Sequence, residues 1–170
     1  RYVNLWEASN LLLQKFPAEA FTATTKVTMV SKEDGQEGGL IVMGWDYSAL
    51  TVRREGDKFL LCQRTCKDAE QGGKETVREL SRFAPSARQT IIYSPTVSRE
   101  IYLRVQVEVG GKCRFAYSLD GEKFTACGEP FQARQGKWIG AKVGFVCVEP
   151  HAEPAVNRGW MDVDWFRVTP

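Results

Sequence analysis

The stretch IYLRVQVEV, residues 101–109, decides the fold. Along it, apolar side chains occupy every second position, and polar side chains or a tyrosine occupy the positions between them. The apolar positions are Ile101, Leu103, Val105, Val107 and Val109, and the others are Tyr102, Arg104, Gln106 and Glu108. A period of two puts each set on its own face of a β-strand. The stretch therefore predicts a strand with one buried and one solvated face.

Tight turns follow this strand and join it to two more. The Gly-Gly pair at 110–111 and the Asp-Gly pair at 120–121 accept the backbone angles that hairpin turns need. Between the turns, KCRFAYS at 112–118 alternates in the same way. Its expected inward residues are Cys113, Phe115 and Tyr117. A third strand is expected at 124–127, so the region predicts an antiparallel meander.

The same alternation recurs along the rest of the chain. Residues 21–29 carry apolar side chains on one face and mostly threonine on the other. Further strands are expected at residues 40–46, 49–55, 58–65, 139–148 and 161–168. Many short strands joined by Gly, Asp and Pro turns predict an all-β fold, a two-sheet antiparallel β-sandwich. No repeat or linker-like change of composition interrupts residues 1–170, so we expect a single domain.

Two stretches fit this pattern poorly. KETVRELSR, residues 74–82, contains good helix formers, but it is short and follows Gly72-Gly73. We predict a strand there, because sheet context overrides helix propensity. In WEASNLLLQKF, residues 6–16, three leucines in a row favour either a fully buried strand or a single helical turn leading into one.

Composition excludes several classes of function. The chain has 23 basic and 21 acidic residues, a net charge of +2, which is too little to neutralise a nucleic-acid backbone or to bind a membrane electrostatically. Its longest apolar runs fall far short of the ~20 residues that a membrane helix needs. We therefore expect neither nucleic acid nor a membrane as partner.

The cysteines and the histidine do not form a recognisable site. Five scattered cysteines predict no disulfide framework and at least one free thiol. Cys62 and Cys66 have the spacing of half a zinc site, but no second pair follows them, so buried thiols acting as small apolar groups are the simpler interpretation. The single histidine, His151, lies in the proline-flanked EPHAEP and is expected in an exposed loop.

Five segments, taken in order, resemble the C-terminal concanavalin-like β-sandwich (jelly roll) domain of β-xylosidases and arabinofuranosidases of glycoside hydrolase family 43. The segments are NLLLQKFPAEAFTATTKV, GGLIVMGWDYSALTVRREG, LRVQVEVGGKCRFAYSLDGEKFTACGEPF, GKWIGAKVGFVCV and MDVDWFRV. They contain the patterns G-L-x-x-x-x-x-D-Y, F-x-Y-S-x-D-G, G-x-x-V-G and D-x-D-x-F. Each pattern alone is weak, but together they cover nearly the whole chain.

The resemblance implies a non-catalytic accessory domain of a hydrolase that acts on xylan- or arabinan-type plant polysaccharides. In that family an upstream β-propeller supplies the catalytic acids, so we assign no catalytic residue and no cofactor here. The sandwich packs on the propeller and in some members lends an aromatic side chain to the pocket. Trp138 lies where that aromatic is expected. The resemblance also implies xylo- or arabino-oligosaccharide as ligand and a periplasmic or extracellular location.

A free-standing carbohydrate-binding (lectin-like) module is the alternative. Sugars stack on aromatic faces and exchange hydrogen bonds with polar groups at the edges. Trp45, Asp46 and Tyr47 form a compact candidate for such a platform, and Arg53 and Arg54 follow on the next strand. Aromatic residues of a sandwich more often belong to its core, and a pure docking domain is a third possibility. Exposure of Trp45, Tyr47, Trp138 and Trp160 discriminates between these interpretations.

Two further motifs have structural or metal-binding interpretations. Asp162 and Asp164 are expected on one face of a strand, where both carboxylates could reach a hard cation such as calcium. Two solvent-facing acids alternating with Met161, Val163 and Trp165 are the simpler explanation. Gly140 and Gly144 are expected within an apolar strand, at a bulge or at a close approach between the packed sheets.

Overall fold

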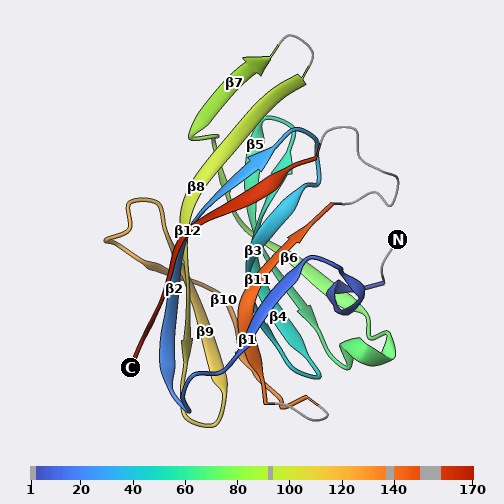
Figure 1. Ribbon diagram of the computed structural model, residues 1–170, viewed down its shortest axis with the longest axis vertical. Coiled ribbons are helices and arrows are strands. Elements are labelled where there is room, and N and C mark those ends of the chain that lie inside the picture. Colours follow the sequence, from blue (N-terminus) through green and yellow to red (C-terminus); the bar gives the residue numbers. More distant parts are fainter. Residues whose placement is uncertain (1–2, 92–93, 137–139, 150–157) are drawn as a thin grey trace.

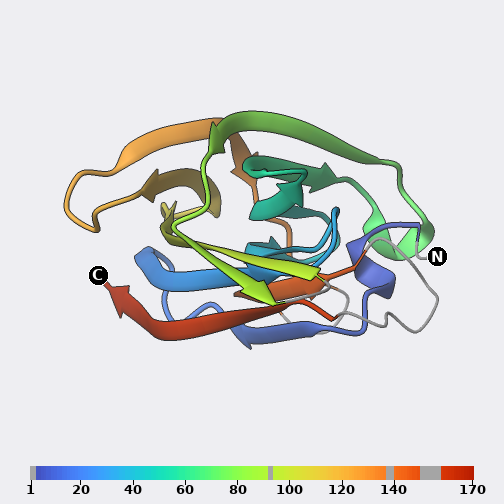
Figure 2. The same cartoon turned by 90° about the horizontal axis from the view of Figure 1, so that it is seen from above.

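The computed structural model describes residues 3–91, 94–136, 140–149 and 158–170. Their strands form two antiparallel sheets that pack face to face, as Figures 1 and 2 show. Sheet A has the order β1 (Leu11–Lys15), β11 (Lys142–Val148), β3 (Glu37–Met43), β4 (Tyr47–Glu55), β5 (Lys58–Cys66) and β6 (Glu75–Phe83). Sheet B has the order β10 (Thr125–Gln132), β9 (Lys112–Ser118), β8 (Ser94–Val107), β2 (Phe21–Ser31) and β12 (Trp160–Thr169), and β7 (Ala87–Ile91) pairs with β8. The predicted all-β sandwich is confirmed.

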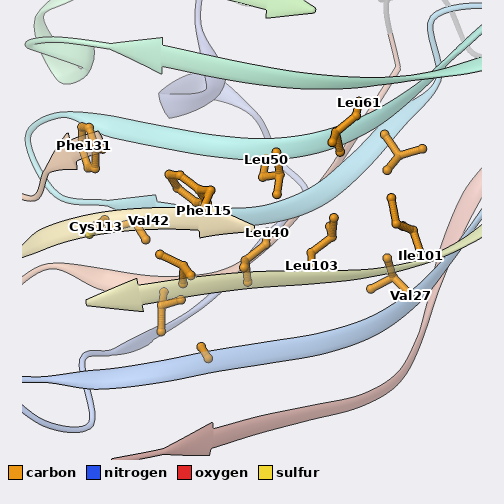
Figure 3. Close-up of a cluster of buried hydrophobic side chains, with 14 of the residues drawn as sticks. Val27, Leu40, Val42, Leu50, Leu61, Ile101, Leu103, Cys113, Phe115 and Phe131 are labelled. Atoms are coloured by element: carbon orange, nitrogen blue, oxygen red, sulfur yellow. The ribbon is translucent and has the colours of Figure 1, made fainter. Parts of the chain in front are cut away.

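The core lies between the inner faces of the two sheets (Figure 3). The alternation in IYLRVQVEV predicts its members correctly: Ile101, Leu103, Val105 and Val107 are all buried. Val109 is an exception, with 72% of its surface exposed, because β8 ends at Val107 and the chain turns there. Buried apolar side chains of this kind supply the main driving force for folding.

A second apolar cluster covers the outer face of sheet A, on the side away from sheet B. It contains Leu5, Ile41, Met43, Tyr47, Ala49, Cys66, Ala69, Val146 and Val148. Two 3-10 turns, η1 (Leu5–Glu7) and η2 (Ala69–Gln71), lie together over this face in Figure 2. The Asn4 amide joins them by donating to the carbonyl oxygens of Ala69 and Gly73, at 2.9 and 3.1 Å.

Both ambiguous stretches are now assigned. The helical turn expected before the leucines is η1, and the leucines begin β1. This strand is not fully buried, since it is a sheet edge and Leu12 is 73% exposed. KETVRELSR contributes most of β6, the other edge of sheet A, so pairing with β5 overrides its helix propensity as predicted.

The glycine interpretation needs two corrections. Gly140 precedes β11 rather than lying within it. Gly144 does mark a close approach, because a Cβ there would lie 2.0 Å from the carbonyl oxygen of Leu12. The neighbour is β1 of the same sheet, however, and not the opposing sheet.

No helix in the described part of the chain has the length and apolar character needed to cross a membrane.

Candidate functional site

The turn between β3 and β4 carries Trp45 and Asp46. The Asp46 carboxylate is buried, accepts a hydrogen bond from the backbone N–H of Asp68 at 2.8 Å, and pairs with Arg134 Nε at 3.1 Å. Arg134 also reaches Asp68 Oδ1 through Nη2 at 3.0 Å. The Arg134 side chain thus links the β3–β4 turn to the loop that contains Asp68.

The segment 133–136 lies directly against this turn. A Cβ on Gly44 would come within 1.7 Å of the carbonyl oxygen of Arg134, so the contact requires glycine. Trp138 itself lies outside the described residues, but the chain that leads to it packs on the turn that carries Trp45.

Tyr47 is fully buried and offers no ring face to a sugar, which fits the core interpretation and not the alternative of an exposed platform. Its hydroxyl accepts a hydrogen bond from the Leu5 N–H at 3.0 Å and donates one to a carboxylate oxygen of Glu75. Burial, together with the Glu75 carboxylate, raises the pKa of Tyr47 well above its usual value. Trp45 is partly exposed, so it alone of the two aromatics is accessible.

Arg53 and Arg54 do not join this site. They lie at the opposite end of β4 from Tyr47. Arg54 is buried and donates to the carbonyl oxygens of Ser31 and Gly56, while Arg53 pairs with Glu55. The hydrogen bonds of Arg54 and the ion pair of Arg53 lie at the far end of β4.

A cleft of about 480 Å³ opens at the end of the sandwich. Its lining comes from the end of β1 and the residues after it, the β8–β9 turn, and residues before and after positions 137–139: Lys15, Phe16, Glu19, Val109, Gly110, Gly111, Ala133, Gln135, Gly140 and Ala141. The Phe16 ring meets Phe21 edge to face at 5.0 Å, which fixes it in the wall. The volume and the mixture of aromatic, charged and amide groups suit a small polar ligand such as a sugar.

An apolar strip, the β1–β12 seam, lies along the edge strands of the two sheets. We define it by Leu12, Phe145, Val163, Phe166 and Val168. Leu12 pairs in register with Phe145, whose ring meets that of Phe166 at 5.4 Å. Leu12, Val163 and Val168 are 73%, 40% and 37% exposed. In Figure 2, β1 and β12 lie on the same side of the molecule. Adjacent exposed apolar side chains of this kind commonly mark a contact surface.

Asp162 and Asp164 are each engaged by a different group. Asp162 Oδ2 accepts a hydrogen bond from the Trp160 indole at 3.1 Å, and Asp164 Oδ2 pairs with Lys26 Nζ at 3.2 Å. Within the described residues, no three His, Cys, Asp or Glu side chains gather closely enough to hold a metal ion. The sequence favours solvent-facing acids over calcium binding by this pair, and that interpretation stays a prediction.

Trp165 lies on the solvent-facing side of its strand, whereas the sequence alternation predicts that it faces inward. The β12 register shifts between Val163 and Trp165, so Trp165 pairs with Lys26 on the solvent-facing side of sheet B. Tyr102 lies beside it, with ring centroids 6.0 Å apart. The sequence interpretation missed this aromatic pair, although the outward position of Tyr102 in IYLRVQVEV was a usable signal.

The five cysteines are all free, and Cys62, Cys66 and Cys113 are buried. Burial raises the pKa of Cys62 to about 11 and that of Cys113 to about 12. A thiol with such a pKa is protonated at neutral pH and a poor nucleophile. Cys62 and Cys66, the pair for which the sequence favours buried thiols over half a zinc site, are both buried.

Comparison with known proteins identifies a family and a set of similar structures. The family described as the β-xylosidase C-terminal concanavalin A-like domain matches residues 2–169. No curated protein matches the chain by sequence. A family 43 hydrolase with an engineered active site, described as having both endo-xylanase and exo-arabinofuranosidase activity, is 17% identical with a TM-score of 0.74. That match covers 98% of this chain and 32% of that one.

Two further solved structures show the same fold. The xylan β-1,4-xylosidase of Bacillus halodurans C-125 is 16% identical with a TM-score of 0.66, and the match covers 95% of this chain and 30% of that one. A bifunctional protein of Bacteroides eggerthii, described as GH43-CE, is 20% identical with a TM-score of 0.69, and the match covers 98% of this chain and 19% of that one. This chain thus spans a third or less of each of these proteins.

Proposed function

Because this chain belongs to the family of β-xylosidase C-terminal concanavalin A-like domains, we propose that it is the non-catalytic accessory domain of a larger glycoside hydrolase. The parent acts on xylan- or arabinan-type plant polysaccharides and is of the β-xylosidase or α-L-arabinofuranosidase type. An upstream β-propeller supplies its catalytic acids. The family match and the length of the similar hydrolases support this assignment.

The buried carboxylates of this chain favour a structural role over catalysis. Glycoside hydrolysis needs two carboxyl groups that face a sugar across a shaped pocket. Glu37 is buried and Glu75 is partly buried, but Arg64 pairs with both, at 3.0 and 2.7 Å. Carboxylates held by one guanidinium stabilise the sheet and are poorly placed to exchange protons with a substrate.

The single observation that carries the docking role is the β1–β12 seam. Leu12 and Val168 expose apolar surface beside a half-buried Phe145–Phe166 pair. Domain interfaces within a chain cover apolar surface of this kind. The upstream propeller is the partner that we propose for the seam.

If the propeller docks at the seam, the cleft lies beside the junction of the two domains. The cleft begins at Lys15 and Phe16, where β1 ends, so a domain seated on β1 borders it. Ala133, Gln135 and Gly140, which flank the region of Trp138 in sequence, line the same cleft. This arrangement supports the proposal that the segment with Trp138 helps to complete the propeller's substrate pocket.

A free-standing sugar-binding module at Trp45, Asp46 and Tyr47 has weaker support. Tyr47 is buried, and the Asp46 carboxylate is engaged by Arg134 and the Asp68 N–H. Trp45 is left without the aromatic and acidic neighbours that the platform needs.

Aryl xyloside and aryl arabinofuranoside hydrolysis tests the accessory function. The 170-residue chain alone should show no turnover above buffer. In the full-length hydrolase, Leu12→Asp and Val168→Asp should lower both turnover and the melting temperature, because each places a charge in the apolar junction. Val77→Asp is the matched control, since Val77 is 41% exposed on β6. Turnover by the purified chain, or equal effects of all three substitutions, would contradict the proposal.

A further inference from the structure

The solvent-facing side of sheet B carries ordered aromatic and cationic side chains. Tyr102, Lys26 and Trp165 lie in register across β8, β2 and β12. In the next row, Arg104 and Arg167 lie on either side of Thr24. We call these residues, with Phe124, the sheet B aromatic face.

A bulge in β12 turns Trp165 onto this face. Strict alternation from Asp162 would put Asp164 on the solvent-facing side and Trp165 inside. The register shift instead pairs Trp165 with Lys26 and gives the inward position to Phe166. Bulges re-aim side chains in this way, often beside functional sites. The fold thus places a large aromatic side chain on its surface and keeps it only partly covered.

A cationic side chain lies against each aromatic ring of the face. The Arg104 guanidinium lies 3.5 Å from the centroid of the Phe124 ring, Arg167 lies 4.3 Å from that of Trp165, and Lys26 lies 5.8 Å from that of Tyr102. Stacking restricts the motion of these side chains, so less entropy is lost when they bind a ligand.

The two arginines of the face have no carboxylate partner among the described residues. Arg104 donates to the Thr24 hydroxyl at 2.9 Å, and Arg167 stacks on Trp165. Arg114, on the same side of the sheet, pairs instead with Glu108 at 2.9 Å. The positive charges of Arg104 and Arg167 are therefore not neutralised by a described carboxylate and can pair with an anionic ligand.

Acidic neighbours limit how much negative charge the ligand can carry. Asp164 and Glu100 both pair with Lys26, at 3.2 and 3.7 Å, and neutralise it. A continuous polyanion would be repelled there, whereas a mostly neutral chain with isolated carboxylates would not. Sugar rings stack on aromatic side chains, and guanidinium groups bind carboxylates in matched geometry.

The hairpin between β9 and β10 bounds the face on one side. Gly121 lies so close to Tyr102 that a Cβ there would be 2.7 Å from its ring. In Figure 2, the turn between β9 and β10 and the C-terminal end of β12 lie on the same side of the molecule. The hairpin thus borders the face at Tyr102.

We propose that the sheet B aromatic face binds an oligosaccharide that carries uronic acid groups. The sugar backbone packs on Trp165 and Tyr102, and the uronate carboxylate pairs with Arg167 or Arg104. This site is separate from the β1–β12 seam, because it uses the outward side of β12 and the seam uses the inward side. It goes beyond the accessory role and does not depend on it.

Two matched ligands test the site on the chain alone. We would titrate it, by amide NMR shifts, with a glucuronic-acid-substituted xylo-oligosaccharide and with the same oligosaccharide lacking the acid. The expected Kd is about 1 mM for the acidic ligand, and it is roughly tenfold weaker for the neutral one. Shifts should map to β2, β8 and β12.

Variants of the face supply the second test. Trp165→Ala and Arg167→Gln should each weaken binding of the acidic ligand by roughly tenfold, with little change in melting temperature for Arg167→Gln. Arg114→Gln is the matched control and should leave the Kd unchanged. Three results would overturn the proposal. They are equal affinity for the two ligands, an unchanged Kd in Arg167→Gln, and no binding of the acidic ligand at a concentration ten times the expected Kd. Binding of poly-glutamate with the same Kd and the same variant losses would also overturn it, in favour of an acidic protein partner.

Discussion

Phe145 of β11 and Phe166 of β12 meet edge to face between the two sheets, with ring centroids 5.4 Å apart and ring planes at 73°. Edge-to-face pairs of this kind add stability beyond the area that they bury. Their partly exposed position, beside Leu12 and Val168, means that the sandwich closes its own core incompletely on this side. The exposed edge is where a neighbouring domain would complete the packing.

The ion pairs of Arg64 should be important for stability. Arg64→Met would leave Glu37 and Glu75 buried without their cation, and we expect unfolding free energy to fall by about 3 kcal/mol or more. Urea denaturation of both proteins measures this. The exposed pair Arg82–Glu79 is the control, and Arg82→Met should cost less than about 1 kcal/mol. Similar losses from the two substitutions would contradict this interpretation.

The Asp120 carboxyl group, in the hairpin turn, should titrate at unusually low pH. Hydrogen bonds from the N–H groups of Lys123 and Glu122, and from the Ser118 hydroxyl, lower the pKa of Asp120 to about 2. Because the folded pKa lies below the unfolded value, the stabilisation is complete above pH 4 and is lost as the pH falls through about 2. NMR titration of the carboxyl carbon should find this midpoint, and Ser118→Ala should raise it. A midpoint near 3.8 in the unaltered chain would refute the role of these bonds.

The core thiols should be inert in the folded chain. Burial keeps the pKa of Cys62 at about 11 and that of Cys113 at about 12, so both stay neutral thiols at pH 8. A maleimide reagent at pH 8, followed by mass spectrometry, should leave both unmodified. All five cysteines should react in denaturant, since none is in a disulfide. Rapid native labelling of Cys62 or Cys113 would show that the core opens more easily than its packing implies.

Gly44 should tolerate no side chain. Gly44→Ala would place a methyl group against the Arg134 carbonyl oxygen, so segment 133–136 must move and the Arg134–Asp46 pair lengthens. We expect a loss of about 1–3 kcal/mol in unfolding free energy. Gly140→Ala is the control, because a Cβ there meets no atom within 4 Å. An equally small effect of both substitutions would contradict the close contact.

The strands were predictable because periodicity reports directly which face is buried. Residues 101–107 show this, and so does β6, where sheet pairing overrides helix propensity as expected. Strand β7 has no clear period of two and was missed; it pairs only with the extension of β8. The prediction of side-chain direction was wrong where the strand departs from regular alternation. At the bulge beside Asp164, Trp165 lies on the opposite side of the sheet from the one predicted.

The candidate site was less predictable than the fold. A tyrosine in G-W-D-Y fits a surface platform or a core equally well, and contacts that are distant in the sequence, such as that with Leu5, 42 residues away, bury Tyr47. The contact between Gly44 and Arg134 is similarly long-range and has no local signal. Exposed apolar side chains such as Leu12 follow from edge position in a sheet, which sequence period alone does not give.

Hydrogen–deuterium exchange tests the central claim, that this sandwich docks on an upstream catalytic domain through the β1–β12 seam. The measurement compares the 170-residue chain alone with the same chain joined to that domain. Backbone amides of β1 and β12 should exchange more slowly in the joined protein, while those of β6, the other edge of sheet A, should not change. Slower exchange in β6 with β1 and β12 unchanged would contradict the account.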